Sequence, residues 1–222
     1  MKRKWKLWMI AFVLFVMTDI MMQSNRAEAK KRTFTVSSKT IPCSSSYRQK
    51  PYYNKKTKQY YMINSYMRRL STTGGTLKLK KGTYKIPGTI YVPSNVKIVC
   101  ANGVKIKKTK ATGTKKVKST KFLFQMISEE KASGKQNTGK YAASKNASIQ
   151  GNGKVIFDMG NVNGATAVFV GHASGITVSG VRFRNKKGGS YIWIEGSKNI
   201  SVRQCVFERK KDVSGLKNRM AV

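Results

Sequence analysis

Apolar and polar residues alternate along much of the second half of the chain. Segment 175–185 reads GITVSGVRFRN, and its apolar positions are Ile176, Val178, Val181 and Phe183. A period of two is typical of a β-strand with one buried face and does not fit the helical period of 3.6. We therefore expect short strands whose apolar side chains point inwards.

The same pattern returns after 24 residues, the separation of Ile176 from Ile200. Segment 199–209 reads NISVRQCVFER, and the strand-like segments 167–171 (AVFVG) and 191–195 (YIWIE) keep the same offset. A fixed period in the twenties, built from strands and turns without helices, is typical of a solenoid. Successive coils of such a protein stack and bury a shared core.

Earlier segments carry weaker versions of the pattern. Segments 95–106 and 146–158 both open with Asn, continue with an apolar-x-apolar run and reach a glycine-containing turn. In 57–70, TKQYYMINSYMRRL, apolar residues recur at helical spacing before the stop signal TTGG, which predicts an amphipathic helix. This helix would cover the first coil and hide its strand edges. The first strands are expected in 74–86.

Two stretches interrupt the regular pattern. Segment 107–121 carries seven lysines, and segment 129–146 is polar and contains glycine. Both are predicted to be protruding loops, the first a solvated and flexible surface.

The chain is expected to divide into three parts. Residues 1–29 have a basic head, an apolar run from Leu7 and an A-x-A site, which is typical of an export signal. The alternative is an uncleaved membrane anchor, although the run is short for a span of about 20 residues. An N-terminal segment with the helix would follow in 30–73, and a partial solenoid in 74–222.

Charge points to the kind of partner. The chain has 45 Lys and Arg against 8 Asp and Glu, and without residues 1–29 it has 40 against 6. Such an excess indicates a polyanionic partner. Export makes an acidic polysaccharide or an anionic cell envelope more accessible than nucleic acid, for which the sequence has no recognition motif.

The three cysteines, Cys43, Cys100 and Cys205, cannot all pair within one chain, and none has metal-ligand spacing. Cys205 takes the place of Val181 in the repeat, as a small buried apolar residue would. We expect no structural disulfide and no metal site, with a Cys43–Cys100 bridge as the alternative.

Several features occur together in the chain: the export signal, the helix before GGTLKLKKGTY, the segments VPSNVKI and IQGNGKVIFD, and the 24-residue coils. This combination resembles the right-handed parallel β-helix superfamily of pectate lyases and polygalacturonases, especially its uncharacterised secreted bacterial members. The resemblance covers nearly all of 55–209. It implies an all-β, right-handed, single-stranded parallel β-helix with an N-terminal capping α-helix, secreted and monomeric. Members generally run for several more coils, which implies a C-terminally truncated chain.

The resemblance leaves catalysis undecided. Polygalacturonase-like enzymes use aspartates in Asn-Thr-Asp and Asp-Asp motifs, and neither motif occurs here. Calcium-dependent pectate lyases use a carboxylate cluster, whereas the coils offer only Asp158, Glu195 and Glu208. No cofactor is therefore evident from the residues, and Ca²⁺ would enter only by analogy with these lyases. By the same analogy, Arg203 would take the proton α to a uronate carboxyl.

Aromatic residues supply the first candidate site. By strand parity, Phe169 should lie one coil from Trp193, with Tyr191 and Glu195 beside Trp193 on the same outward face. Such a platform suits stacking on sugar rings. The alternative is that loop 129–146 folds over the rings and buries them.

Arginines supply the second candidate site. Arg182, Arg184 and Arg203 should point outwards, where they could bind the carboxylates of an acidic polysaccharide. Arg184 aligns with Glu208, so we expect an ion pair there and favour Arg203 for binding. His172, the only histidine, is expected at a turn with an ordinary backbone hydrogen bond.

Two hypotheses follow. The first is a secreted, pectate-lyase-like β-helix protein that binds or acts on an anionic polysaccharide. The alternative is a non-catalytic surface or adhesive solenoid bound to anionic cell-envelope polymers, with no membrane contact after signal cleavage.

Overall fold

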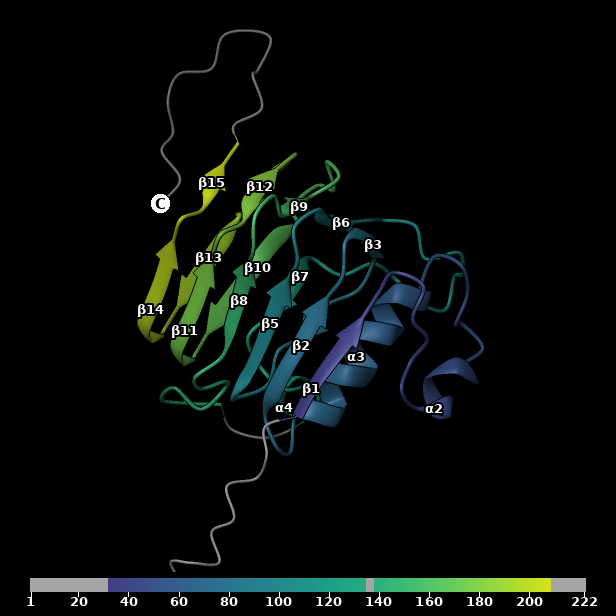
Figure 1. Ribbon diagram of the computed structural model, residues 1–222, viewed down its shortest axis with the longest axis horizontal. Coiled ribbons are helices and arrows are strands. Elements are labelled where there is room, and N and C mark those ends of the chain that lie inside the picture. Colours follow the sequence, from purple (N-terminus) through teal and green to yellow (C-terminus); the bar gives the residue numbers. More distant parts are fainter. Residues whose placement is uncertain (1–31, 135–137, 209–222) are drawn as a thin grey trace, which may run out of the picture. The chain divides into compact units, whose positions relative to one another are not determined.

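The computed structural model describes residues 32–134 and 138–208, so the predicted export signal lies outside the described part. Three parallel sheets make up the fold (Figure 1). Sheet A contains β1 (Arg32–Val36), β2 (Gly75–Leu79), β5 (Val96–Cys100), β8 (Ser148–Gly151), β11 (Ser174–Ser179) and β14 (Lys198–Arg203). Sheet B contains β3 (Gly82–Ile86), β6 (Val104–Lys108), β9 (Ile156–Asp158), β12 (Arg182–Arg184) and β15 (Val206–Phe207). Sheet C contains β4 (Ile90–Tyr91), β7 (Phe122–Gln125), β10 (Thr166–Gly171) and β13 (Ile192–Glu195).

From β2 onwards the chain visits sheets A, B and C in turn, and each strand pairs in parallel with the equivalent strand of the next coil. This is a single-stranded parallel β-helix, so the expected fold class is confirmed. The 24-residue register is also confirmed, because Ile176 pairs with Ile200 and Phe169 with Trp193. One coil earlier the offset changes: Val178 pairs with Ile149.

The inner rows of the three sheets form one core. Sheet A contributes Leu77, Ile98, Ile149 and Val178, all fully buried. An aromatic stack joins sheets B and C: the Phe157 ring lies 5.2 Å from that of Phe124 and 5.5 Å from that of Phe183. Burying these side chains is the main stabilising contribution to the coils.

The predicted helix is α3 (Lys58–Leu70), within one residue of the expected range. Its apolar side joins the core through Met62, Ile63 and Met67, and its Asn64 amide donates to the carbonyl oxygen of Thr89 at 3.0 Å. The Asn64 Oδ1 accepts from the Tyr91 N–H, so the helix is fastened to β4. Its role as a cap for the solenoid stays a prediction.

Four local features differ from the sequence prediction. Strand β1 was not foreseen, yet it pairs with β2 along its whole length and extends sheet A. The lysine-rich segment begins inside β6, whose last residue, Lys108, is fully buried. The polar segment 129–146 contains the short helix α4 (Glu129–Ser133). A further short helix, α2 (Ser45–Arg48), precedes α3.

Tight bends connect the coils. Asn95, Asn146, His172 and Asn199 have φ between 50° and 60°, the left-handed region that asparagine tolerates best among non-glycine residues. Cys43, Cys100 and Cys205 are all free thiols, so the alternative Cys43–Cys100 bridge is not formed. Within the described residues, no helix is long and apolar enough to cross a membrane.

Candidate functional site

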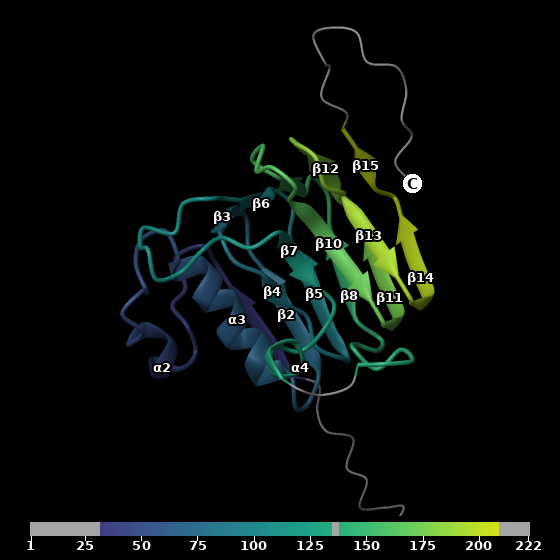
Figure 2. The ribbon, with the colours of Figure 1, turned by 180° about the vertical axis from the view of Figure 1, so that it is seen from behind.

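The outer face of sheet C carries a row of side chains across four coils. Strand register places Tyr91 beside Gln125, Gln125 beside Phe169, and Phe169 beside Trp193. Figure 2 shows the four strands, β4, β7, β10 and β13, side by side. Because successive residues of a strand point to opposite faces, the neighbouring Phe124 and Val168 point into the core.

Three rings contact one another where this row meets the start of β7, and we call them the aromatic cluster: Phe122, Phe169 and Trp193. The rings of Phe122 and Phe169 stack with centroids 4.6 Å apart and planes 12° apart. Trp193 stands edge-on to Phe169 at 5.2 Å, and it remains 47% exposed. These are favourable geometries for aromatic pairs. Segment 129–146 therefore does not bury Trp193, the alternative considered from the sequence.

A buried lysine fixes the start of β7, the strand that carries Phe122. The Lys108 Nζ lies 2.8–3.1 Å from the carbonyl oxygens of Pro87, Gly88 and Phe122 and 3.2 Å from the Thr120 hydroxyl, so its three N–H groups are shared among four acceptors. Burial lowers the pKa of Lys108 to about 7. Lys108 thus links the bend after β3 to the backbone of Phe122 in the next coil.

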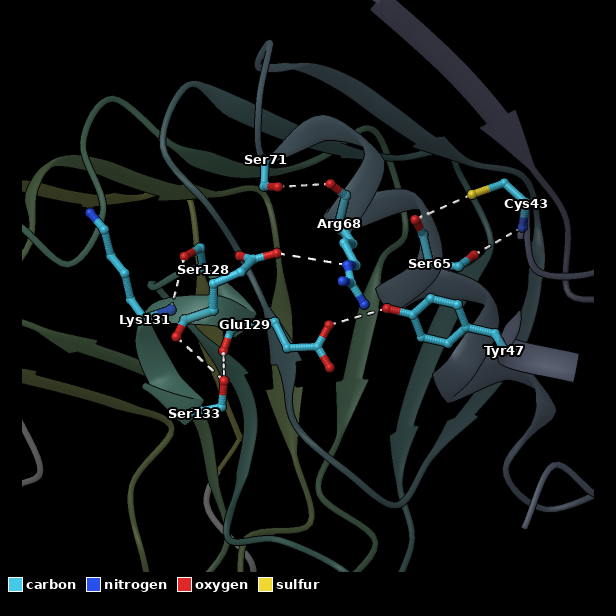
Figure 3. A network of polar contacts seen from close by, with 10 residues as sticks. Cys43, Tyr47, Ser65, Arg68, Ser71, Ser128, Glu129, Lys131 and Ser133 are labelled. Atoms are coloured by element: carbon cyan, nitrogen blue, oxygen red, sulfur yellow. Dashed lines mark hydrogen bonds and ion pairs between the residues drawn. The ribbon is translucent and has the colours of Figure 1, made fainter. Parts of the chain in front are cut away.

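At the other end of the row, Tyr91 borders a small hollow between α3, β4 and α4. Its lining residues are Asn64, Met67, Arg68, Ser71, Tyr91, Pro93, Glu129 and Glu130. Figure 3 shows the polar contacts at its rim. The Tyr47 hydroxyl donates to Glu129 Oε2 at 3.1 Å, and Arg68 Nε lies 3.8 Å from Glu130 Oε1.

These rim contacts join three helices. Burial and the neighbouring Glu129 carboxylate raise the pKa of Tyr47 to about 12, so its phenol stays protonated and donates. Both glutamates already have partners, one a phenol and the other a guanidinium. Their arrangement supports a structural link between α2, α3 and α4 and gives no separated pair of free carboxyl groups for glycoside hydrolysis.

The predicted aromatic platform is partly formed. Phe169 and Trp193 contact each other, and Glu195 lies exposed two residues further along the same face of β13. Tyr191 does not lie beside Trp193, so that placement was wrong. Its ring packs 5.7 Å from Phe183 and its hydroxyl donates to the Glu208 carbonyl, because Tyr191 precedes β13 at the corner with sheet B.

The predicted arginines lie away from the aromatic cluster. Arg182 and Arg184 belong to sheet B, whereas the exposed Arg203 ends β14 in sheet A. The predicted Arg184–Glu208 ion pair is wrong. Arg184 turns to Asp158 of the preceding coil at 3.4 Å, and Glu208 pairs with Arg182 at 2.9 Å.

His172 occupies the turn between β10 and β11. Its N–H donates to the Glu195 carbonyl at 3.0 Å and its carbonyl accepts from Ala143, as expected for a turn residue with ordinary backbone bonds. Sequence reasoning missed Phe122, Lys108 and the Tyr47–Glu129 contact. Phe122 had a usable signal, since it starts the apolar run FLF directly after the lysine-rich segment.

The carboxylates do not fit a calcium ion. Among the described residues, no three His, Cys, Asp or Glu side chains gather as metal ligands. Asp158 accepts from Asn185, the Gly160 N–H and two cations, and Glu208 is engaged by Arg182. A calcium site needs six to eight oxygen ligands.

No protein-family model and no curated protein sequence matches the chain. Among solved structures, it is similar to PfbA, a surface adhesin of Streptococcus pneumoniae, with 16% identity and a TM-score of 0.49 over 68% of this chain and 34% of the adhesin chain. It is also similar to an iota-carrageenase of family GH82 from A. fortis, with 20% identity and a TM-score of 0.45 over 68% of this chain and 40% of the other. The chain thus spans well under half the length of either structure.

Proposed function

We propose that the protein is an extracellular binding protein that holds an acidic polysaccharide on the outer face of sheet C. The observation that supports this most is the aromatic cluster, in which an exposed Trp193 ring is held edge-on by Phe169. A half-exposed tryptophan beside two other rings is a large apolar area in a chain with a net charge of +37. Such a patch is typical of a contact surface.

The chemistry of the face suits a sugar chain. Sugar rings present C–H groups on their flat faces, which pack on aromatic rings, and hydroxyls at their edges, which bind Gln125 and Glu195. A polymer running along the stack would meet Tyr91, Gln125, Phe169 and Trp193 in successive coils, about 4.8 Å apart. The excess of lysine and arginine favours an acidic polymer over a neutral one.

The proposal is binding without bond cleavage. Arg203, the candidate base of a lyase, ends β14 in sheet A and does not share a face with Trp193. The lyase hypothesis keeps a direct test: incubation with polygalacturonate, with and without Ca²⁺, while the absorbance of unsaturated products is followed. Product formation by the folded protein would replace binding with catalysis as the function.

Tryptophan fluorescence tests the binding site. The chain has three tryptophans, of which Trp193 alone lies in the described part. We expect oligogalacturonate to change the fluorescence of the full chain at about 1 M salt, where charge attraction is screened. Trp193→Phe should remove that change, and Trp193→Ala should weaken binding at least about tenfold, by analogy with base stacking on aromatic side chains at roughly 1–3 kcal/mol.

Tyr141→Ala is the matched control. Tyr141 is an exposed aromatic residue that lies against Lys198, outside the aromatic cluster. Its loss should leave the affinity unchanged within about twofold. Equal weakening by Trp193→Ala and Tyr141→Ala, or an undiminished fluorescence change in Trp193→Phe, would refute the proposed site.

A further inference from the structure

The outer face of sheet B carries a ladder of cations that the aromatic cluster does not use. Register places Lys85 beside Lys107, Lys107 beside Asp158, and Asp158 beside Arg184. A parallel row one step along the strands contains Lys105 and Arg182. Five of the outward positions are therefore basic, with successive rungs about 4.8 Å apart. We call these five residues the basic ladder.

One carboxylate fixes the middle of the basic ladder. Asp158 is almost fully buried, with 4% of its side chain exposed, and lies 3.0 Å from the Lys105 ammonium and 3.4 Å from the Arg184 guanidinium. Burial alone would raise its pKa, but hydrogen bonds from Asn185, the Gly160 N–H and Lys105 lower the pKa of Asp158 to about 2. Asp158 is therefore ionised at any physiological pH and holds both cations in place.

The ladder nevertheless keeps unbalanced positive charge. Asp158 neutralises one of the two cations that it touches, and Glu208 neutralises Arg182. Lys85 and Lys107 form no ion pair with any described residue, although they occupy neighbouring rungs of one row. Like charges in register repel by roughly 0.2–1 kcal/mol, so an anion between them would relieve a cost already present in the fold.

A second unsatisfied group lies two rungs further along. Arg184 Nε is buried and has no hydrogen-bond partner among the described residues. Unpaired buried donors are uncommon in folded proteins. The row therefore offers two free ammonium groups, Lys85 and Lys107, on neighbouring strands, whereas the buried Arg184 Nε does not reach the surface.

We propose that the basic ladder is a second binding surface, which takes a linear polyanion with closely spaced carboxylates or phosphates. The polymer lies across the strands, along the stack, so that its charges meet Lys85 on β3 and then Lys107 on β6, where Lys105 lies two residues away. The inference goes beyond the sugar site, because sheet B requires anionic groups and no sugar ring. A flat row also lacks a helix or ribbon that could enter a groove of duplex DNA, which disfavours that partner.

The test compares two double variants with the same change in net charge. Lys85→Gln/Lys107→Gln removes the free cations of the ladder. Lys78→Gln/Lys97→Gln removes two exposed lysines from the outer face of sheet A. Polyphosphate and oligogalacturonate, titrated at several salt concentrations, are the probes, because polyphosphate has no ring to stack on Trp193. Lys78, Lys85 and Lys97 are exposed and Lys107 is half-buried without an ion pair, so thermal unfolding should be nearly unchanged in both variants.

We expect the ladder variant to lose at least about tenfold in polyphosphate affinity, and its dependence of log K on log salt to become shallower by roughly one to two units. The sheet A variant should change affinity less than about twofold. Weakening of both probes indicates a general anion surface, and weakening of one identifies phosphate or carboxylate as the ligand group. Equal losses in the two double variants, or no loss in the ladder variant, would overturn the proposal.

Two further arms keep the proposals separate. Trp193→Ala should leave polyphosphate binding intact, so failure of the sugar site would not remove the ladder site. Duplex DNA is the competing partner. If Lys85→Gln/Lys107→Gln weakened DNA binding more than binding to either linear polymer, the surface would be a nucleic-acid site instead.

Discussion

Sheets B and C have similar inner faces and dissimilar outer faces. Inside, Phe124 of sheet C stacks against Phe157 of sheet B, and both are fully buried. Outside, sheet C presents Trp193 and its aromatic neighbours, whereas sheet B presents lysines and arginines around Asp158. The difference shows that the inner row determines how coils stack, while the outer row can carry quite different chemistry on the same backbone.

The largest expected effect on stability comes from a change in the inner core that sheets B and C share. Phe157→Ala should lower the free energy of unfolding by about 3–5 kcal/mol, since it removes the ring between Phe124 and Phe183 and leaves a cavity. Urea denaturation measures the change. Phe169→Ala, an outer-face change, is the control and should cost clearly less. Equal losses would mean that inner and outer rings contribute alike, contrary to this comparison.

The next effect is confined to sheet B. Asp158→Asn should cost about 2–4 kcal/mol, because it leaves Lys105 and Arg184 without their shared carboxylate. The low pKa of Asp158 also predicts a pH dependence. Its contribution is complete above the unfolded pKa of about 4 and is lost as pH falls towards about 2.

Acid denaturation of Asp158→Asn should therefore be less steep than that of the original protein in this range. Glu195→Gln, at an exposed position of sheet C, should change stability by less than about 0.5 kcal/mol. A steep acid transition that persists unchanged in Asp158→Asn would show that Asp158 does not hold the ladder.

A smaller effect concerns the corner that joins the two sheets. Because burial lowers the pKa of Lys108 to about 7, the unfolded chain binds more protons than the folded one above neutral pH. Stability should therefore rise with pH, by about 2 kcal/mol from about pH 7 to about pH 9. The Lys108→Met variant should not show this rise in stability with pH. It should also be less stable than the original protein, because the carbonyl oxygens of Pro87 and Phe122 lose a hydrogen-bond donor.

Urea unfolding of both proteins at the two pH values measures the difference, and charges common to both cancel. Lys110→Met, an exposed change in the following loop, should keep the original pH dependence. If Lys108→Met kept it as well, Lys108 would carry its charge unperturbed in the folded protein.

The sequence predicted the fold where coils follow one another without insertion. Ile176 and Ile200 stand 24 residues apart in sequence and pair in space, because the turns of these two coils have equal length. Upstream, the same kind of pairing joins Phe124 to Val168 across segment 129–146, and the period disappears from the sequence. Strand β1 was missed because it lies before α3, outside the repeating pattern.

The sites were harder to predict because a β-helix has three outer faces. Alternation identifies Trp193, Arg182 and Arg203 as outward residues but does not say that they lie on sheets C, B and A. Strand register also does not determine which carboxylate an arginine pairs with. Arg184 has a neighbour in each adjoining coil, and it pairs with Asp158, the more buried carboxylate, instead of Glu208.

Crossed binding titrations test most directly whether the two outer faces act separately. Trp193→Ala and Lys85→Gln/Lys107→Gln would each be titrated with oligogalacturonate at about 1 M salt and with polyphosphate at low salt. We predict that the tryptophan variant loses about tenfold or more with the sugar and stays within about twofold with polyphosphate, and that the lysine variant does the reverse. Losses in the same proportion for both ligands in both variants would contradict two separate surfaces.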